Sequence, residues 1–382
     1  MKRRKIFRIL DRYIGIPIVV LLRLLNFNFS KKLPEKTKKI IFVKFAAVGD
    51  IVLLIPTLNL FKKKFPDAEI DFLCTNINSG IIKTIPFLDN VIVCKVYDFI
   101  KNPFYFLNFV KMLRKKQYDL LIDAEQWARI DAIISFFIKK KFSIGFKTKK
   151  QFRHYNYSVS VDHSRYNHES ENFLNLLKPL GIVAQESDKI PEFYLTDDDI
   201  EFAEKYWEEK GLKNQKIICF QPGCGTGSFA REWKEENYAA LGRKILEYDP
   251  GIRFFVMGTE NDFEKCQKIV YGIGKNSENL AGKFSMGKDL AIIRKTELLV
   301  CSNTGILHMA AAIGIKTIGL HGPNNPKQWG AYSEKAEVIL SDIFCSPCLY
   351  LGHEYGCITP VCMPRIKVED VYLKVREILD KG

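Results

Sequence analysis

The sequence predicts an α/β fold built from two similar halves, and three observations support this. Short apolar runs alternate with helical patterns before residue 182, and the same alternation resumes after residue 198. A polar segment containing Pro191 separates the two series. Residues 298–320 read as a strand–helix–strand unit. Alternation of this kind predicts parallel sheets with right-handed crossovers, so we expect two α/β domains facing across a cleft.

Composition is that of a globular protein with two domains. The chain has 382 residues, of which 47% are hydrophobic and 27% charged, values that exclude extensive disorder. The net charge of +14 is concentrated in residues 1–39, which hold 12 Lys/Arg against Asp11 and Glu35. Because the remainder carries only +4, the charge gives no reason to expect a nucleic-acid partner.

Residues 1–37 form a separate basic segment with apolar residues at helical spacing. Arg23 interrupts the apolar run, which is too short to span a bilayer, and no small-residue cleavage site follows it. The pattern favours an amphipathic helix, kinked at Pro17, that binds an anionic membrane surface through residues 1–30. The alternative is a helix packed on the protein's own surface.

The first predicted domain spans residues 38–185. An apolar strand at 40–45 leads into the turn that ends at Asp50, and a helix then runs from 51 to 65. Residues 139–153 carry seven basic residues and no acid, as expected of either a groove for an anionic acceptor or a solvated surface loop. Further strands are expected at 69–74, 91–96, 119–123 and 155–162, and further helices at 79–85, 104–116, 128–138 and 169–180.

The second predicted domain spans residues 186–365. A final helix within 366–382 is expected to pack back toward the first domain. Strands are expected at 217–221, 253–258, 298–301 and 315–320, and helices at 197–210, 237–248, 261–273, 287–295 and 304–313.

The strand–helix–strand unit of the second domain is a candidate anion site. Its helix begins near Thr304, directly after a buried strand, and Gly305 would allow close approach to the backbone. Ligands of open α/β sheets bind at this edge, where free amides and the helix dipole attract phosphate. The alternative is that Ser302 and Asn303 only cap a structural helix.

Ten cysteines occur, and four of them lie close together near the end of the second domain. Their spacing is not that of a zinc ribbon, so a structural zinc site, disulfides and unpaired thiols all remain open. The four are Cys345, Cys348, Cys357 and Cys362.

Four motifs together resemble glycosyltransferase family 9, the bacterial lipopolysaccharide heptosyltransferases. They are FVKFAAVGD (42–50), FQPGC with FAREWK (220–234), FVMGTE (255–260), and CSNTG through PKQWG (301–330) with CSPC (345–348) beyond. The resemblance implies two Rossmann-like domains in the GT-B arrangement. It also implies inverting, metal-independent transfer of heptose from ADP-heptose to a lipopolysaccharide core or related membrane glycan, with no cofactor, by an enzyme peripheral on the cytoplasmic face of the membrane.

The resemblance also suggests roles for individual residues. Asp50 matches the proposed catalytic base, whose alternative role is capping the following helix. Arg231 stands where a phosphate-binding lysine is usual, and Asn303 where Asp is common. The donor-binding set is Arg231, Glu260, Asn303, Thr304, Gly305, His308, Gly223 and Thr226. The acceptor-side set is Lys44, Gly49, Glu125 and Arg129.

Two other functions compete with this interpretation. One is a nucleotide-sugar epimerase or hydrolase of the same architecture, and the other is a non-catalytic module that binds sugar nucleotides. A carboxylate at position 50 argues against the non-catalytic module. A dehydrogenase is disfavoured because no Gly-x-Gly-x-x-Gly follows the first strand.

Overall fold

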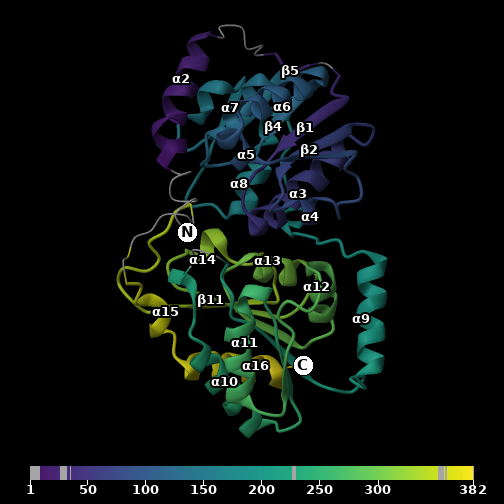
Figure 1. Cartoon of the computed structure of the whole chain (residues 1–382), viewed down its shortest axis with the longest axis vertical. Coiled ribbons are helices and arrows are strands. Elements are labelled where there is room, and N and C mark those ends of the chain that lie inside the picture. The colour runs from purple at the N-terminus through teal and green to yellow at the C-terminus, as the bar shows by residue number, and fades with distance from the viewer. Residues whose placement is uncertain are drawn as a thin grey trace. The chain divides into compact units, whose positions relative to one another are not determined.

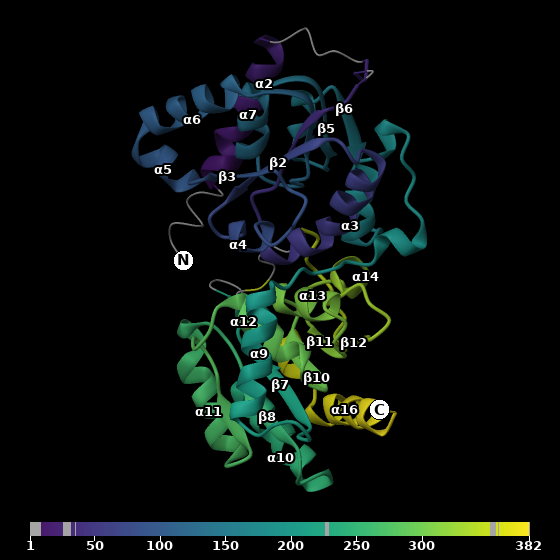
Figure 2. The ribbon, with the colours of Figure 1, turned by 90° about the vertical axis from the view of Figure 1, so that its right-hand side faces the viewer.

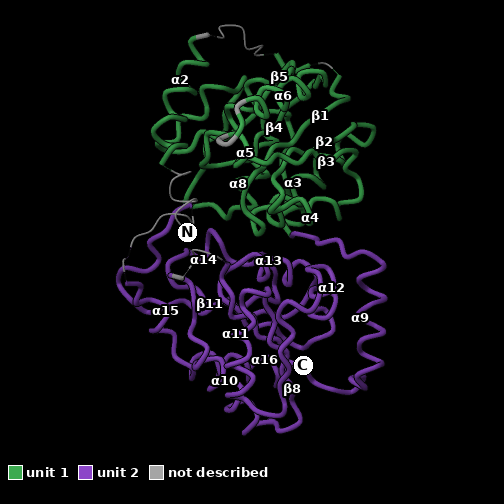
Figure 3. The backbone as a smooth tube through the Cα atoms, in the orientation of Figure 1, with its two compact units in different colours: residues 1–190 green, residues 191–382 purple. Residues whose placement is uncertain are grey.

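The computed structural model describes residues 9–25, 32–34, 36–225, 229–351, 357 and 359–381. The chain divides into two compact units, residues 1–190 and 191–382 (Figure 3). The division falls within the polar segment that separates the two strand–helix series.

The first unit is built on a parallel sheet with strand order β3-β2-β1-β4-β5-β6 (Figure 1). The strands are β1 (Lys39–Val43), β2 (Glu69–Thr75), β3 (Asn90–Cys94), β4 (Gln117–Asp123), β5 (Lys139–Lys147) and β6 (Val159–Asp162). The helices include α2 (Gly15–Leu25), α3 (Val48–Lys64), α4 (Ser79–Ile82), α5 (Val96–Lys101), α6 (Pro103–Lys115), α7 (Ile130–Phe137) and α8 (Glu169–Asn175).

The second unit has a parallel sheet with strand order β12-β11-β10-β7-β8-β9. The strands are β7 (Ile217–Gln221), β8 (Arg253–Val256), β9 (Ser277–Asn279), β10 (Leu298–Ser302), β11 (Thr317–His321) and β12 (Ala336–Leu340). The helices include α9 (Asp197–Glu209), α10 (Glu235–Tyr248), α11 (Phe263–Ile273), α12 (Met286–Arg294), α13 (Gly305–Ala312), α14 (Pro326–Trp329), α15 (Cys362–Arg365) and α16 (Val368–Asp380).

Both sheets therefore share one topology, in which the chain starts in the middle, runs to one edge, and returns to build the other half. The strand order reverses between β1 and β4 in the first unit and between β7 and β10 in the second. The central strands are almost entirely buried, as parallel strands covered on both faces must be. Such a reversal leaves a crevice at the carboxyl ends of the two strands, where ligands of this fold bind.

The last helix packs within its own unit. We expected residues 366–382 to pack back toward the first domain. Within the second unit, Val371 and Val375 of this helix are fully buried in the core. Helix α16 lies beside α10 there (Figure 2). The apolar face of α16 faces this core, which accounts for its position.

The N-terminal segment is packed on the first unit. Ile9–Tyr13 is helical, a turn follows at Ile14, and α2 then lies along α7 (Figures 1 and 2). Val19 and Leu22 are buried against α7. No helix in the described ranges is both long and apolar enough to cross a bilayer.

Two regions differ from the expected elements. Residues 139–147 form strand β5 rather than a loop, because Phe142, Ile144 and Phe146 are buried in the sheet while the lysines at its ends reach solvent. Strands β9 and β12 were not expected, since β9 has only three residues and β12 is half exposed.

Candidate active site

In the first unit, four polar side chains meet at the point where the strand order reverses. Lys44 follows β1, and its buried ammonium lies 3.0 Å from the Asp50 carboxylate and 3.2 Å from that of Glu125. It also donates a 2.6 Å hydrogen bond to Gln126 Oε1. Glu125 and Gln126 follow β4, and Asp50 lies in the first turn of α3. The predicted residues Lys44, Asp50 and Glu125 are thus brought together.

Asp50 is the member of this group that reaches solvent. Its side chain is 14% exposed, whereas those of Lys44 and Glu125 are fully buried. Gln126 Nε2 donates to Asp50 Oδ2 at 2.9 Å, and the Lys44 ammonium lies 3.0 Å from the same oxygen, so both side chains hold the carboxylate in place. A carboxylate held in this way can accept a proton from a group that arrives from solvent.

The charges of the group influence one another. Burial alone would lower the pKa of Lys44, but Asp50 and Glu125 raise it above its ordinary value. Burial raises the pKa of Glu125, and the Lys44 ammonium opposes that rise. Glu125 also accepts a 3.2 Å hydrogen bond from the Ala46 amide, which ties the loop after β1 to the end of β4.

Further buried hydrogen bonds hold the side chain of Gln126 in place. Its Nε2 also donates to Glu169 Oε1 at 3.1 Å, and that same oxygen lies 2.8 Å from His163 Nε2. Asn172 Nδ2 donates to the other oxygen of Glu169 at 3.1 Å. These side chains come from α8 and from the segment after β6, so the position of Asp50 depends on distant parts of the unit.

The other two acceptor-side predictions are Arg129, which pairs with Asp11, and Gly49, which directly precedes Asp50. Arg129 is 5% exposed, and its Nη1 and backbone N–H both donate to the Asp11 carboxylate, at 3.0 and 2.8 Å. Since Ile130 N also donates to Asp11, this carboxylate caps the first turn of α7 and binds the N-terminal segment to it. Gly49 lies in the first turn of α3, directly before Asp50.

In the second unit, the start of α13 forms the candidate anion site. Thr304 is the N-cap in extended conformation, and its side chain does not cap the helix. Thr304 Oγ1 and Gln221 Oε1 are both buried and have no hydrogen-bond partner among the described residues. Thr304 follows β10 and Gln221 ends β7, the two strands between which the strand order reverses. Buried polar atoms of this kind require a partner, which a ligand can supply.

Arg231 is held beside this helix terminus. Its Nη1 donates a 3.1 Å hydrogen bond to the backbone oxygen of Asn303. The guanidinium therefore lies one residue from Thr304, and its positive charge adds to that of the helix N-terminus.

Asn303 and His308 are both buried, at 4% and 5% exposure. Asn303 Nδ2 donates a 2.5 Å hydrogen bond to the backbone oxygen of Trp329, so this amide connects the end of β10 to α14. His308 lies one turn into α13 and faces the interior of the unit.

The remaining donor-side predictions surround the carboxyl ends of β7 and β8. A Cβ on Gly223 would lie 2.6 Å from the Asp262 carboxyl carbon, so a larger residue there would displace the Asp262 carboxylate. Glu260 follows β8 and is exposed, two residues before Asp262. Thr226 lies outside the described residues.

His321 at the end of β11 was not among the predicted site residues. Burial lowers its pKa to about 4, which keeps the imidazole neutral near pH 7. Gln126, Glu169 and His163 were also missed. Gln126 lies three residues after β4, and His321 ends β11. A position at the carboxyl end of a buried strand is the signal that would have identified them.

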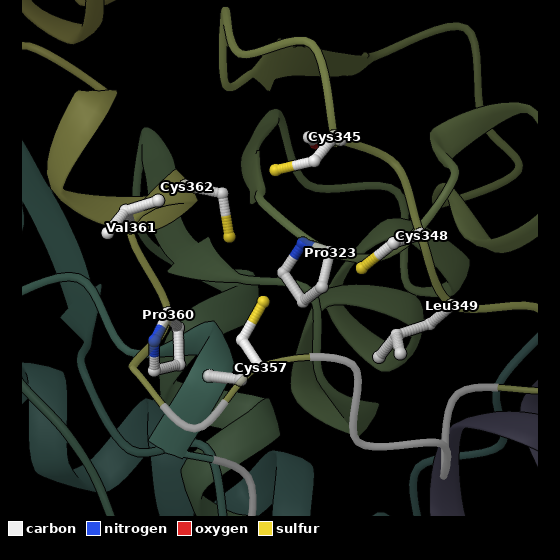
Figure 4. A pocket seen from close by; sticks show the side chains of 10 residues that line it. Pro323, Cys345, Cys348, Leu349, Cys357, Pro360, Val361 and Cys362 are labelled. Atoms are coloured by element: carbon white, nitrogen blue, oxygen red, sulfur yellow. The ribbon is translucent and has the colours of Figure 1, made fainter.

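The four clustered cysteines all line one pocket at the edge of the second unit (Figure 4). Burial raises the pKa of Cys348, and the other three thiols raise it further.

Comparison with known proteins connects these sites to one family. The model of glycosyltransferase family 9 (heptosyltransferase) matches residues 106–359. The lipopolysaccharide core heptosyltransferase OpsX of Haemophilus influenzae is 24% identical over 309 residues, which cover 80% of this chain and 85% of OpsX.

Solved structures show the same architecture. A family 9 glycosyltransferase from Veillonella parvula superposes with a TM-score of 0.75 at 18% identity, covering 92% of this chain and all of the other. The heptosyltransferase WaaC of E. coli, solved with ADP, gives a TM-score of 0.69 at 18% identity and covers 89% of this chain and 99% of WaaC. The matches and the two parallel sheets confirm the predicted GT-B fold.

Proposed function

This chain belongs to glycosyltransferase family 9, and from that premise we propose that it transfers heptose from ADP-heptose to a lipopolysaccharide core or related membrane glycan. As a family member it is a glycosyltransferase. The observation that carries the proposed chemistry is that the two units carry different groups at the place where the strand order reverses. One presents a solvent-reaching carboxylate, and the other presents a helix terminus with an arginine beside it.

We assign the role of general base to Asp50. It would accept the proton of the acceptor hydroxyl as that oxygen attacks the anomeric carbon and the nucleotide diphosphate departs. Attack on the face opposite the leaving group inverts the anomeric configuration. A positioned base contributes about 10²–10⁴-fold to such a step.

The second unit would bind the donor. The amides at the start of α13, the hydroxyl of Thr304 and the guanidinium of Arg231 would bind the diphosphate, where negative charge develops during transfer. These groups supply positive potential from the protein itself, which is why we propose a metal-independent reaction. Glu260 would contact the ribose, and Gly223, which lacks a side chain, would let the nucleotide approach the backbone after β7.

ADP is the proposed nucleotide for two reasons. Family membership implies a nucleotide-sugar donor, and the WaaC comparison structure was solved with ADP. Asn303 donates its amide to Trp329 and so differs from the carboxylate common in the family.

The N-terminal segment would bind the cytoplasmic face of an anionic membrane, where a lipid-linked acceptor resides. One face of α2 is buried on α7, yet Leu21 and Leu24 remain 55% and 59% exposed beside Arg23. Exposed leucines next to basic side chains suit insertion at the boundary of headgroups and acyl chains. The parts of this segment at residues 1–8 and 26–30 lie outside the described residues.

A thermal-shift panel of ADP-, UDP-, GDP- and CMP-linked ligands tests the donor assignment. A ligand that binds only the folded chain must raise its unfolding temperature. We expect ADP and ADP-heptose to stabilise the protein and the other nucleotides to have little effect. Stabilisation by UDP but not ADP would overturn the heptose assignment. Release of free sugar or an epimerised donor without transfer would instead indicate a hydrolase or epimerase.

A further inference from the structure

Four thiols from one C-terminal segment face a common pocket. Cys345, Cys348, Cys357 and Cys362, here called the cysteine cluster, line it together with Pro323 and Pro360. In Figure 4 their sulfur atoms point inward from different sides of the pocket. Cys362 is buried, Cys345 is half-buried, and the other two are exposed.

The residues that carry the cluster are hydrogen-bonded to the loop after β11. The Cys348 and Leu349 amides both donate to Pro323 O at 2.9 Å, and Ser346 Oγ donates to Gly322 O at 2.5 Å. Ser341 Oγ donates to Cys362 O at 2.6 Å. These hydrogen bonds hold the described residues around Cys348 and Cys362 against the neighbouring loop and Ser341.

Convergence of four thiols on one pocket suits a single ion better than two disulfides. A tetrahedral ion uses four sulfur ligands at once, whereas disulfides would divide them into pairs that face each other. The six other cysteines are all buried and distributed over both units, where they pack as apolar side chains. The cluster thus differs from the rest of the cysteines in both exposure and grouping.

We propose that the cysteine cluster binds one thiophilic divalent cation, zinc or iron(II), as a structural site of the second unit. The described residues contain no three His, Cys, Asp or Glu side chains already positioned to hold an ion. Binding must therefore draw the four sulfurs together around the ion. The thiol protons leave to solvent as the sulfur–metal bonds form.

Such an ion would stabilise the part of the second unit that we propose binds the donor. Trp329 Nε1 donates to Tyr350 O at 2.8 Å, and Trp329 O accepts from Asn303, the residue before the N-cap of α13. The hydrogen bonds of Trp329 thereby link the segment that follows Cys348 to the start of the candidate diphosphate site. The ion would reinforce that connection and take no part in transfer.

The experiment measures metal content and so is independent of transferase activity. The full chain is purified without oxygen or chelator and examined by elemental mass spectrometry, which distinguishes zinc from iron. We expect about one equivalent per chain. After metal removal, Co²⁺ should restore occupancy and produce the sulfur-to-cobalt charge-transfer absorption of a thiolate site.

Variants assign the site to the cluster. Cys348→Ser and Cys357→Ser alter exposed positions, and each should lower metal content, while Cys74→Ala in β2 should retain it. Should a variant fail to fold, protection of the four thiols from alkylation by Zn²⁺ in the unmodified protein gives the same information. A chain without metal that takes up neither Zn²⁺ nor Co²⁺, or one in which mass spectrometry finds cluster disulfides, would overturn the proposal.

Discussion

The fully buried ammonium of Lys44 lies 3.0 Å from the carboxylate of Asp50, which is the solvent-reaching end of a larger buried network. A lysine in this position fixes the direction of the carboxylate. Gln126 connects the two side chains by a hydrogen bond to each. The proposed base is therefore positioned by the fold and does not depend on a substrate to arrange it.

Asp50→Asn should abolish most transfer while leaving donor binding intact. The amide retains the shape of the side chain and can still accept from Gln126, but it cannot take up a proton. We expect kcat to fall by about 10²–10⁴-fold with an unchanged Kd for ADP. Asp67→Asn, at an exposed turn after α3, is the matched control. Normal turnover in the Asp50 variant would remove this residue from the mechanism.

Lys44→Met should destabilise the first unit because it leaves the buried Glu125 without its cation. Removing one partner of a buried ion pair costs about 3–5 kcal/mol. Burial already raises the pKa of Glu125, and without Lys44 that pKa should rise further. A raised folded-state pKa gives stability that is lost as pH rises, so the cost should be smaller at pH 5 than at pH 8.

Urea denaturation followed by circular dichroism at the two pH values measures this cost. Lys95→Met removes an exposed lysine of the same unit and should change stability little. An Lys44 variant that matches this control at both pH values would show that the ion pair contributes nothing to stability.

Arg231→Ala should weaken ADP binding, and Arg231→Lys should weaken it less. A hydrogen bond to a charged group contributes about 1.5–3 kcal/mol, so the alanine variant should bind ADP about tenfold to a hundredfold more weakly. Lysine restores the charge without the forked geometry. Calorimetric titration with ADP provides the measurement, and Arg294→Ala at an exposed position of α12 provides the control. Equal ADP affinity in all three variants would exclude Arg231 from the diphosphate site.

Sequence patterns were sufficient for the architecture because buried parallel strands are continuous apolar runs with distinct ends. They also placed Asp50 and Thr304, whose roles are proposals, at the starts of helices that follow such strands. They could not identify Glu169 as a partner of Gln126, since 43 residues separate the two and only the completed sheet joins them. They also gave no means to foresee that Arg153, the last residue of a basic run, would be fully buried between Asp123 and Asp131.

Helix α16 shows a limit of what helical periodicity can predict. Its apolar face predicted that it would pack on some surface, but periodicity does not say which one. The structure places that face in the core of the second unit.

Leu21→Ser combined with Leu24→Ser should reduce binding to anionic vesicles. Each leucine buried in a membrane contributes about 1.5–3 kcal/mol, so removing two should lower partitioning at least about a hundredfold. Val183→Ser with Tyr271→Ser removes two large side chains elsewhere that are even more exposed, at 75% and 78%, and should leave partitioning unchanged. Vesicle sedimentation at low and high salt separates the basic contribution from the apolar one. Unaltered sedimentation of the leucine variant would exclude α2 as the contact.

Acidification should destabilise the second unit through His321. Burial lowers the pKa of this histidine to about 4 from its ordinary 6.5, so the unfolded chain takes up a proton over a range in which the folded chain does not. Stability from this residue is therefore complete above pH 6.5 and is lost as pH falls from there toward 4. The shift corresponds to about 3 kcal/mol.

His321→Gln removes the titration and should flatten the dependence of unfolding free energy on pH by about that amount. Tryptophan fluorescence during urea unfolding reports mainly on this unit, because Trp207, Trp233 and Trp329 lie within it and only Trp127 lies elsewhere. If the glutamine variant and the unmodified chain lose equal stability between pH 7 and pH 5, then His321 is not the titrating group and the neutral imidazole at the end of β11 contributes no acid sensitivity.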